Sequence, residues 1–165
     1  VSEELLRTGR DQLKGSGMES DPPLVIHPTA RVPNKQWPLE GFREVCSHLK
    51  QNNIPVIAVT SKIEWSEELA VLEVPVLRCR SLGELTGILN LARGVLAHDS
   101  VISHLAAALG KPTVSIFGTC YVSEFAPFRN EEFVVQDGNH DERPDLTLGS
   151  LPPSEVVESV EKSLL

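Results

Sequence analysis

The sequence contains 165 residues, of which 41% are hydrophobic, and its formal net charge is −8. This length and apolar content suit one globular domain and exclude an intrinsically disordered or fibrous chain. Because 15 basic residues are outnumbered by 23 acidic ones, the composition argues against a nucleic-acid partner, which would need a basic face. The sequence begins at Val1 rather than Met, and we expect it to be a piece of a longer protein.

Cysteine spacing and hydropathy bound the chemistry and the compartment. The three cysteines, Cys46, Cys79 and Cys120, lie far apart and form no CxxC pair, so we expect neither a zinc site nor a disulfide framework. No apolar run reaches about 18 residues, which predicts that the chain has no transmembrane segment. We therefore expect a protein of a reducing compartment, the cytoplasm.

The chain opens with a predicted helix over 2–14, and the Gly- and Pro-containing stretch up to residue 23 reads as a linker. We place the boundary there, with an N-terminal helix and linker over 1–23 and a domain over 24–165. SKIE and SLGE are predicted capping boxes, and Gly110 is a predicted helix C-cap. The predicted strands are 24–27, 55–60, 75–79, 94–99, 112–118 and, at an edge, 133–136; the predicted helices are 39–51, 61–72, 81–92, 101–109 and a last one from Ser154.

This alternation of strands and helices predicts an α/β fold, a Rossmann-like doubly wound parallel sheet. Continuous apolar strands indicate that helices cover both faces of the sheet. Such sheets bind ligands in the crevice beyond the carboxyl ends of their strands. Polar residues follow the predicted strands at that edge, among them Thr29, Thr60 and Asp99.

The strongest local feature is HDSVISHLAAALGKP over 98–112, in which a helix starts directly after a strand. The free N–H groups and the dipole of a helix start favour an anion, and the Ser100 hydroxyl could bind a phosphate oxygen. His104 lies one turn later on the same helix face. The local pattern alone also fits a simpler interpretation, in which Asp99 caps the helix and His104 is a half-buried structural histidine.

Three further polar residues follow the first two strands, and the residues alone leave their roles open. Lys35, in the loop after the first strand, could neutralise a pyrophosphate or be an ordinary solvated lysine. Glu64 could complete the SKIE capping box or hold the hydroxyls of a ribose. His27 could bind a ligand, although a buried histidine bonded to the backbone is the simpler interpretation. The stretch NHDERPD over 139–145 lacks metal-ligand spacing and is expected to be a solvated loop.

The order and spacing of these elements resemble a known family. HPTARVPNKQWPLEGFREV, a strand followed by Glu64, and SLGELTGILNLARGVLAHDSVISHLAAALGKPTVSIFG are similar to the C-terminal half of the heptosyltransferases, the ADP-heptose:lipopolysaccharide glycosyltransferases of glycosyltransferase family 9. The resemblance covers about 24–164, and its most specific part is D-S/T-x-x-x-H-L-x-A-A with K-x-W-P upstream. It implies a GT-B architecture, in which an N-terminal domain receives a lipopolysaccharide precursor and this domain holds the nucleotide-sugar donor.

The resemblance also implies residue roles and a reaction. Lys35 matches the lysine that meets the phosphates, Glu64 the acidic residue at the ribose, and Asp99 the aspartate at the donor sugar. The reaction is expected to be inverting and independent of metals and cofactors, with ADP-heptose as a substrate and the catalytic base in the N-terminal domain. No catalytic or metal-binding residue is therefore expected in this chain, and the expected donor-binding residues are Lys35, Glu64, Asp99, Ser100, Val101, Ile102, His104, Thr29 and Thr60.

Two departures from the family pattern keep other interpretations open. Val101 and Thr29 stand where the family usually has glycine. The chain is expected to be the donor half of a transferase that is inactive without its acceptor domain and that, at full length, lies in the cytoplasm or against the inner membrane. The alternatives are a non-catalytic module with the same fold and half of another GT-B enzyme, such as a nucleotide-sugar 2-epimerase.

Overall fold

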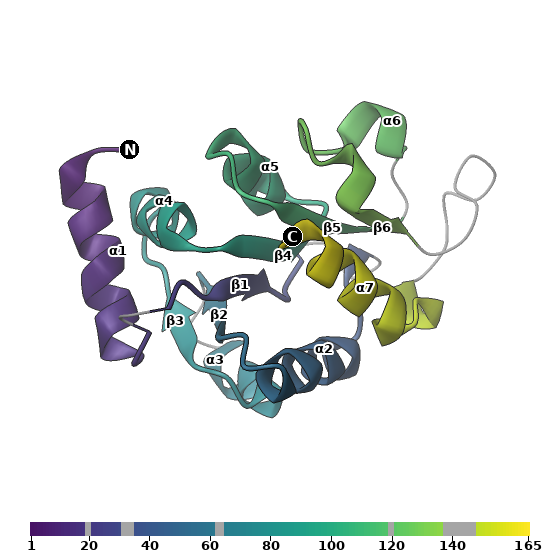
Figure 1. Ribbon diagram of the computed structural model, residues 1–165, viewed down its shortest axis with the longest axis horizontal. Helices are drawn as coiled ribbons and strands as arrows, with labels where there is room; N and C mark the ends of the chain where they lie inside the picture. The colour runs from purple at the N-terminus through teal and green to yellow at the C-terminus, as the bar shows by residue number, and fades with distance from the viewer. Residues whose placement is uncertain (19–20, 31–34, 62–64, 119–120, 137–147) are drawn as a thin grey trace.

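The architecture is a parallel β-sheet between two layers of helices (Figure 1). The computed structural model describes residues 1–18, 21–30, 35–61, 65–118, 121–136 and 148–165. Within these ranges six strands pair in the order β3-β2-β1-β4-β5-β6, and every neighbouring pair is parallel. The predicted doubly wound fold is thus confirmed. The strands are β1 (Leu24–His27), β2 (Val56–Thr60), β3 (Val76–Arg78), β4 (Gly94–His98), β5 (Thr113–Phe117) and β6 (Val134–Gln136).

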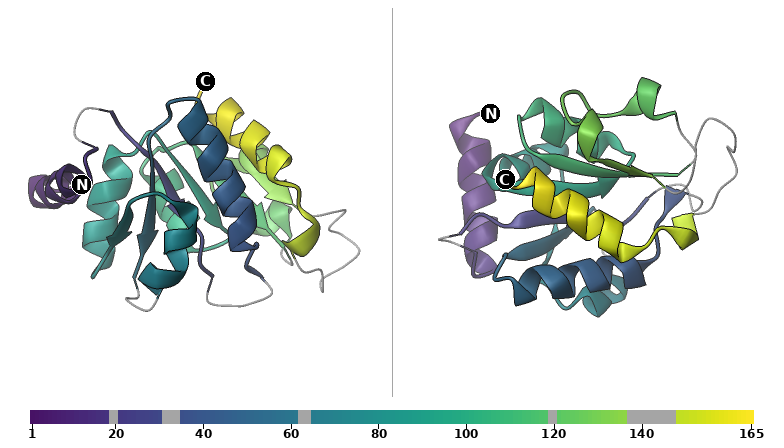
Figure 2. Two further views of the ribbon diagram at one scale, coloured as in Figure 1. Left: turned by 90° about the horizontal axis from the view of Figure 1, so that it is seen from below. Right: turned by 45° about the vertical axis from the view of Figure 1, so that its right-hand side comes forward.

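The helices divide between the two faces of the sheet (Figures 1 and 2). On one face lie α2 (Leu39–Gln51), α3 (Trp65–Glu68), the 3₁₀ turn η2 (Leu69–Leu72) and α7 (Pro153–Ser163). On the other lie α4 (Leu82–Leu91) and α5 (Val101–Ala108), and α1 (Glu3–Gly15) packs outside α4. The short elements α6 (Val122–Phe125), η3 (Glu131–Phe133) and η4 (Leu148–Ser150) complete the described chain. None of the helices described is long and apolar enough to cross a membrane.

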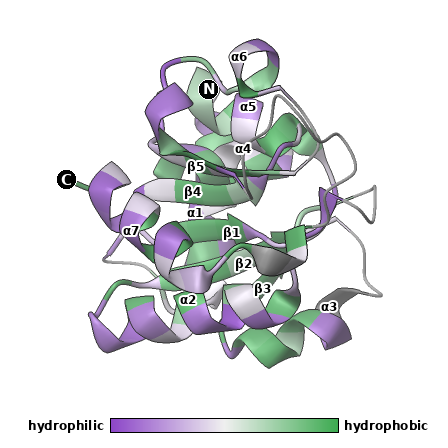
Figure 3. Cartoon of the chain, turned by 90° about the vertical axis from the view of Figure 1, so that its right-hand side faces the viewer, coloured by the Kyte–Doolittle hydropathy of each residue, from purple (hydrophilic) through white to green (hydrophobic). Residues whose placement is uncertain are grey.

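Alternating strand residues build two separate hydrophobic cores. Leu24, Ile26 and Leu96 point into the core beneath α2 and α7, whereas Val25 and Val95 point into the core beneath α4 and α5. Because successive strand side chains project to opposite faces, a strand buried on both sides is apolar along most of its length. Figure 3 shows these hydrophobic strands between helices with hydrophilic outer surfaces.

Most element boundaries fall close to the sequence predictions. The strand over 24–27 and the helix over 39–51 have the predicted bounds. Gly110 follows α5 with a φ of 72°, and its N–H and that of Lys111 donate to the carbonyls of Ala107 and Ala106. This is a Schellman motif, so the predicted glycine C-cap is confirmed.

Three local predictions need correction. Asp99 does not cap α5, since Ser100 is the N-cap. In SLGE, Ser81 Oγ accepts from the Glu84 N–H at 3.1 Å as predicted, but the Glu84 carboxylate accepts from the Arg80 N–H at 2.7 Å, one residue before the expected partner. The helix predicted over 61–72 is a single α turn, Trp65–Glu68, followed by a 3₁₀ turn. It ends at Glu73, whose φ of 52° breaks the helix, and residues 62–64 of SKIE lie outside the described residues.

Helix α1 is attached to the domain by a close crossing of two backbones. A Cβ atom added to Gly87 of α4 would lie 2.2 Å from the carbonyl oxygen of Leu5, and one added to Gly9 of α1 would lie 2.6 Å from the carbonyl carbon of Gly87. Leu13 reaches the core beneath α4. Glycine at both positions is therefore a packing requirement rather than a conformational one.

Candidate functional site

The two helix layers leave a crevice where the strands end. The helix after β1 covers one face of the sheet and the helix after β4 covers the other, so the chain diverges between these neighbouring strands. This topological switch point is the usual binding place of open α/β sheets. The residues predicted to bind the donor, where described, lie at the end of β2 or after β1 and β4 at this edge.

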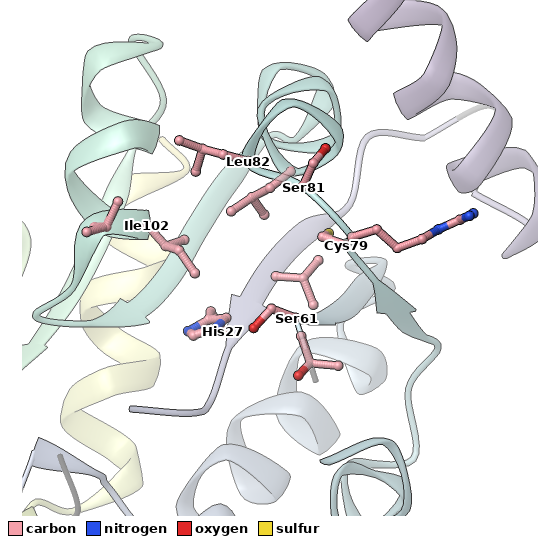
Figure 4. A pocket seen from close by; sticks show the side chains of 11 residues that line it. His27, Ser61, Cys79, Ser81, Leu82 and Ile102 are labelled. Carbon is pink, nitrogen blue, oxygen red and sulfur yellow. The ribbon is translucent and has the colours of Figure 1, made fainter. Parts of the chain in front are cut away.

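A cavity of about 320 Å³ opens at this edge, between the ends of β1, β2 and β3 and the first turns of α4 and α5. Figure 4 shows His27, Ser61, Cys79, Ser81, Leu82 and Ile102 around it. Its interior is mainly aliphatic, with hydroxyls of the residues that end β2 and begin α4. Such a mixture of apolar walls and few polar groups is typical of a small-molecule site.

An ion pair joins the two halves of the crevice. Lys35 Nζ lies 2.6 Å from Asp99 Oδ2, across 64 positions of sequence. The Asp99 side chain is only 11% exposed and that of Lys35 is 28% exposed, so the pair is partly shielded from water and the charges interact more strongly than at an open surface. The structure therefore brings together the two charged residues that the sequence singled out in separate motifs.

The start of α5 forms the neighbouring wall. Ser100 is its N-cap and forms a capping box with Ser103, in which the Ser100 side chain faces the Ser103 backbone N–H. The buried Ser100 Oγ makes no hydrogen bond of normal geometry among the described residues. Ser103 Oγ instead contacts the Ser100 backbone, accepting from its N–H at 3.4 Å and donating to its carbonyl at 2.7 Å. Val101 is 69% exposed and, with Ile102, lines the cavity. An oxygen-rich ligand at this rim would meet the positive end of a helix dipole.

His98 anchors the loop that carries Lys35. The Trp37 N–H donates to His98 Nε2 at 2.8 Å, and the Trp37 indole Nε1 donates to the carbonyl of Leu151 at 3.1 Å. The Phe42 ring meets both the Trp37 and His98 rings edge to face, with centroids 4.9 and 5.3 Å apart. The sequence did not indicate this role of His98, because it depends on the Trp37 N–H, which lies 61 positions away in the chain.

Burial keeps both histidines at the crevice neutral. It lowers the pKa of His98 to about 3, assisted by nearby His27 and opposed by a backbone group of Thr29 and by Asp99. Burial likewise lowers the pKa of His27 to about 4. His27 lines the cavity, and its Nε2 lies 3.3 Å from Thr29 Oγ1. Its side-chain partner is thus a threonine hydroxyl, and it borders the candidate ligand space.

Only some of the other predicted site residues lie at the cavity. Thr60 lines the cavity and is buried, as is Thr29 beside His27. His104 is exposed on α5 and is not among the residues that line the cavity, so it is not the half-buried histidine of the simpler interpretation. Glu64 lies outside the described residues, as do Cys120 and the stretch 139–145. In the described part of the chain no group of three or more His, Cys, Asp or Glu side chains could hold a metal ion.

Fold and crevice together define an α/β protein of the Rossmann-like class. The structure of a family 9 glycosyltransferase from Veillonella parvula superposes with a TM-score of 0.84 at 17% identity, covering 99% of this chain and 52% of that one. That of Escherichia coli ADP-heptose LPS heptosyltransferase II gives a TM-score of 0.77 at 20% identity, with the same coverage. These likenesses establish the fold.

Sequence comparison establishes the family. The family model of glycosyltransferase family 9 (heptosyltransferase) matches residues 2–151, so the chain belongs to this family. It is similar to the lipopolysaccharide core heptosyltransferase OpsX of Haemophilus influenzae, with 29% identity over 122 residues that cover 68% of this chain and 35% of that protein. The chain thus spans between about a third and about half the length of these relatives.

Proposed function

We propose that this chain is the donor-binding half of a glycosyltransferase of lipopolysaccharide core synthesis, with ADP-heptose or a related nucleotide-sugar as its ligand. The observation that carries the proposal is the Lys35–Asp99 pair at 2.6 Å, directly before the start of α5. The pair lies at the same switch point of the sheet as the cavity, although neither residue lines it. Membership of the family and the name of one structural neighbour, an ADP-heptose heptosyltransferase, support this choice of donor.

Each part of such a donor has a chemically suitable place in the crevice. The aliphatic cavity of about 320 Å³ suits the nucleoside. The diphosphate would lie against Lys35, Ser100 and the first amides of α5, which together offer positive charge and hydrogen-bond donors. Asp99 would then exchange its contact with Lys35 for one with a sugar hydroxyl.

The proposed chemistry is an inverting displacement at the anomeric carbon. An acceptor hydroxyl forms the new C–O bond while the bond to the β-phosphate breaks, and the nucleoside diphosphate leaves with the electron pair. Lys35 and the α5 amides would stabilise the charge that develops on the leaving group. The hydroxyl proton goes to a base that we place in the acceptor domain, outside this chain, so we expect donor binding without sugar transfer. No step of this scheme requires a metal.

Isothermal titration of the folded 165-residue chain against ADP, ADP-heptose and UDP-GlcNAc tests the proposal. We expect ADP and ADP-heptose to bind and UDP-GlcNAc to bind at least tenfold more weakly. Lys35→Ala and Asp99→Ala are each expected to change the dissociation constants of the ADP ligands. Lys162→Ala, at a lysine on the distant helix α7, is the matched control. Preference for UDP-GlcNAc would favour the epimerase-like alternative, and absence of all binding would favour a non-catalytic module.

A further inference from the structure

The buried His98 is linked to both residues of the Lys35–Asp99 ion pair. His98 is the last residue of β4, is fully buried and directly precedes Asp99. Through its Nε2 it also accepts the backbone N–H of Trp37, two residues after Lys35. Asp99 is therefore the direct chain neighbour of His98. Lys35 is linked to His98 by the Trp37 hydrogen bond and the two peptide units between Lys35 and Trp37.

This hydrogen bond requires one specific form of the imidazole. A backbone N–H can only donate, so Nε2 must be unprotonated and the ring proton must lie on Nδ1. The Phe42 ring, whose centroid is 5.3 Å from that of His98, packs against the imidazole. Because the ring is buried, the Trp37 N–H would have no water to replace His98 if the acceptor were lost.

Trp37 transmits this anchoring to the lysine. The Trp37 side chain is 1% exposed, is packed on Phe42 and is bonded to the carbonyl of Leu151. Its ring is thus held by the α2 side of the core, whereas its backbone is held by His98 of β4. Only Gln36 separates this fixed point from Lys35, so the position of the His98–Trp37 bond sets where the Lys35 backbone enters the crevice.

We propose that His98 is a positioning residue, which places Lys35 for the donor diphosphate by accepting the Trp37 N–H. This inference rests on the proposed function and deepens it, because it assigns a role in phosphate binding to a residue that need not touch the ligand. It accounts for a histidine held neutral in a buried position next to the site.

A matched pair of variants tests the hydrogen bond. Gln and Met have similar length and shape, but only Gln carries an acceptor, near the place of Nε2. We expect His98→Met to weaken ADP binding roughly five- to thirtyfold, because a displaced Lys35 loses much of one charge-assisted hydrogen bond to the phosphate, and His98→Gln to restore most of the affinity. Binding of adenosine, which lacks phosphates, is expected to stay within about twofold in both variants.

A double-mutant cycle shows whether the effect runs through Lys35. In a Lys35→Ala background, His98→Met is expected to have little further effect on ADP affinity, because the residue being positioned is gone. An equal loss in both backgrounds would overturn the proposal, as would equal ADP affinities of the Met and Gln variants.

Two NMR measurements decide the positioning without any ligand. The imidazole ¹⁵N spectrum of the wild-type chain is expected to show an unprotonated Nε2 and a protonated Nδ1 on His98. Exchange of the Trp37 amide with deuterium is expected to accelerate at least tenfold in His98→Met relative to His98→Gln. A protonated Nε2, or unchanged exchange, would contradict the inference. If both expectations are met and the wild-type chain binds no nucleotide, the result would instead contradict the proposed function.

Discussion

Replacing Asp99 by Asn should strengthen the binding of ADP, although Asp99 is a predicted donor-binding residue. In the unliganded chain Asp99 Oδ2 holds Lys35 Nζ at 2.6 Å, and the carboxylate is only 11% exposed. A phosphate that binds the lysine competes with this carboxylate for its charge and its N–H donors. Shielded charge-assisted hydrogen bonds contribute roughly 1.5–3 kcal/mol and exposed ion pairs roughly 0–1 kcal/mol. Since this pair is intermediate in exposure, we expect about 1–2 kcal/mol.

This energy corresponds to a roughly five- to thirtyfold gain in ADP affinity for Asp99→Asn. The variant keeps the shape of the side chain and removes its charge, and titration calorimetry at constant ionic strength measures the effect. The gain should vanish in the Lys35→Ala background. For ADP-heptose the gain should be smaller or reversed, because the sugar would lose its carboxylate partner. An Asp99→Asn chain that binds ADP no more tightly than the wild type would refute the reasoning.

Three other predictions concern stability and the mouth of the cavity. Gly87→Ala places a Cβ 2.2 Å from a main-chain oxygen of α1 and should lower the free energy of unfolding, measured in urea, by roughly 1–3 kcal/mol. The control Gly15→Ala, whose Cβ meets nothing within 4 Å, should be neutral. Equal effects of the two substitutions would contradict the close crossing of α1 and α4. Burial lowers the pKa of His98 to about 3 in the folded state, so its contribution to the free energy of unfolding is complete above pH 6.5 and is lost on acidification at about 1.4 kcal/mol per pH unit. His98→Gln should therefore remove about 2 kcal/mol of the stability difference between pH 7 and pH 5. An unchanged difference would argue against the neutral buried ring. Val101→Gly should raise ADP affinity several-fold by uncovering the first amides of α5, and a loss of affinity would show that this side chain contacts the nucleotide.

The fold was predictable because each face of the sheet imposes a periodicity on the sequence. The strand at 24–27 is apolar up to its last residue, His27, because both its faces are buried. The helix at 39–51 has its apolar residues at helical spacing for a single buried face. Element ends were less predictable. The Glu84 carboxylate accepts from the Arg80 N–H rather than from the Ser81 N–H. The spacing of a capping box in the sequence does not distinguish between these two adjacent N–H groups.

The site was predictable in its location and less so in its contacts. The rule that ligands bind beyond the strand ends, together with the family resemblance, put Lys35 and Asp99 at the same edge. Their ion pair depends on the course of a loop, which the Trp37–His98 bond fixes across 61 positions of sequence. Gly87, by contrast, carried a usable signal, since glycine inside a helix often marks a close approach of backbones.

The most direct test of the central claim is the affinity of the folded chain for ADP and for adenosine, compared between wild type and Lys35→Ala by titration calorimetry. If the crevice binds a nucleoside diphosphate through Lys35 and the start of α5, the wild type binds ADP more tightly than adenosine. Lys35→Ala then loses at least about tenfold of its ADP affinity and keeps its adenosine affinity. Equal ADP affinities of the two chains, or a wild type that does not distinguish ADP from adenosine, would contradict the account.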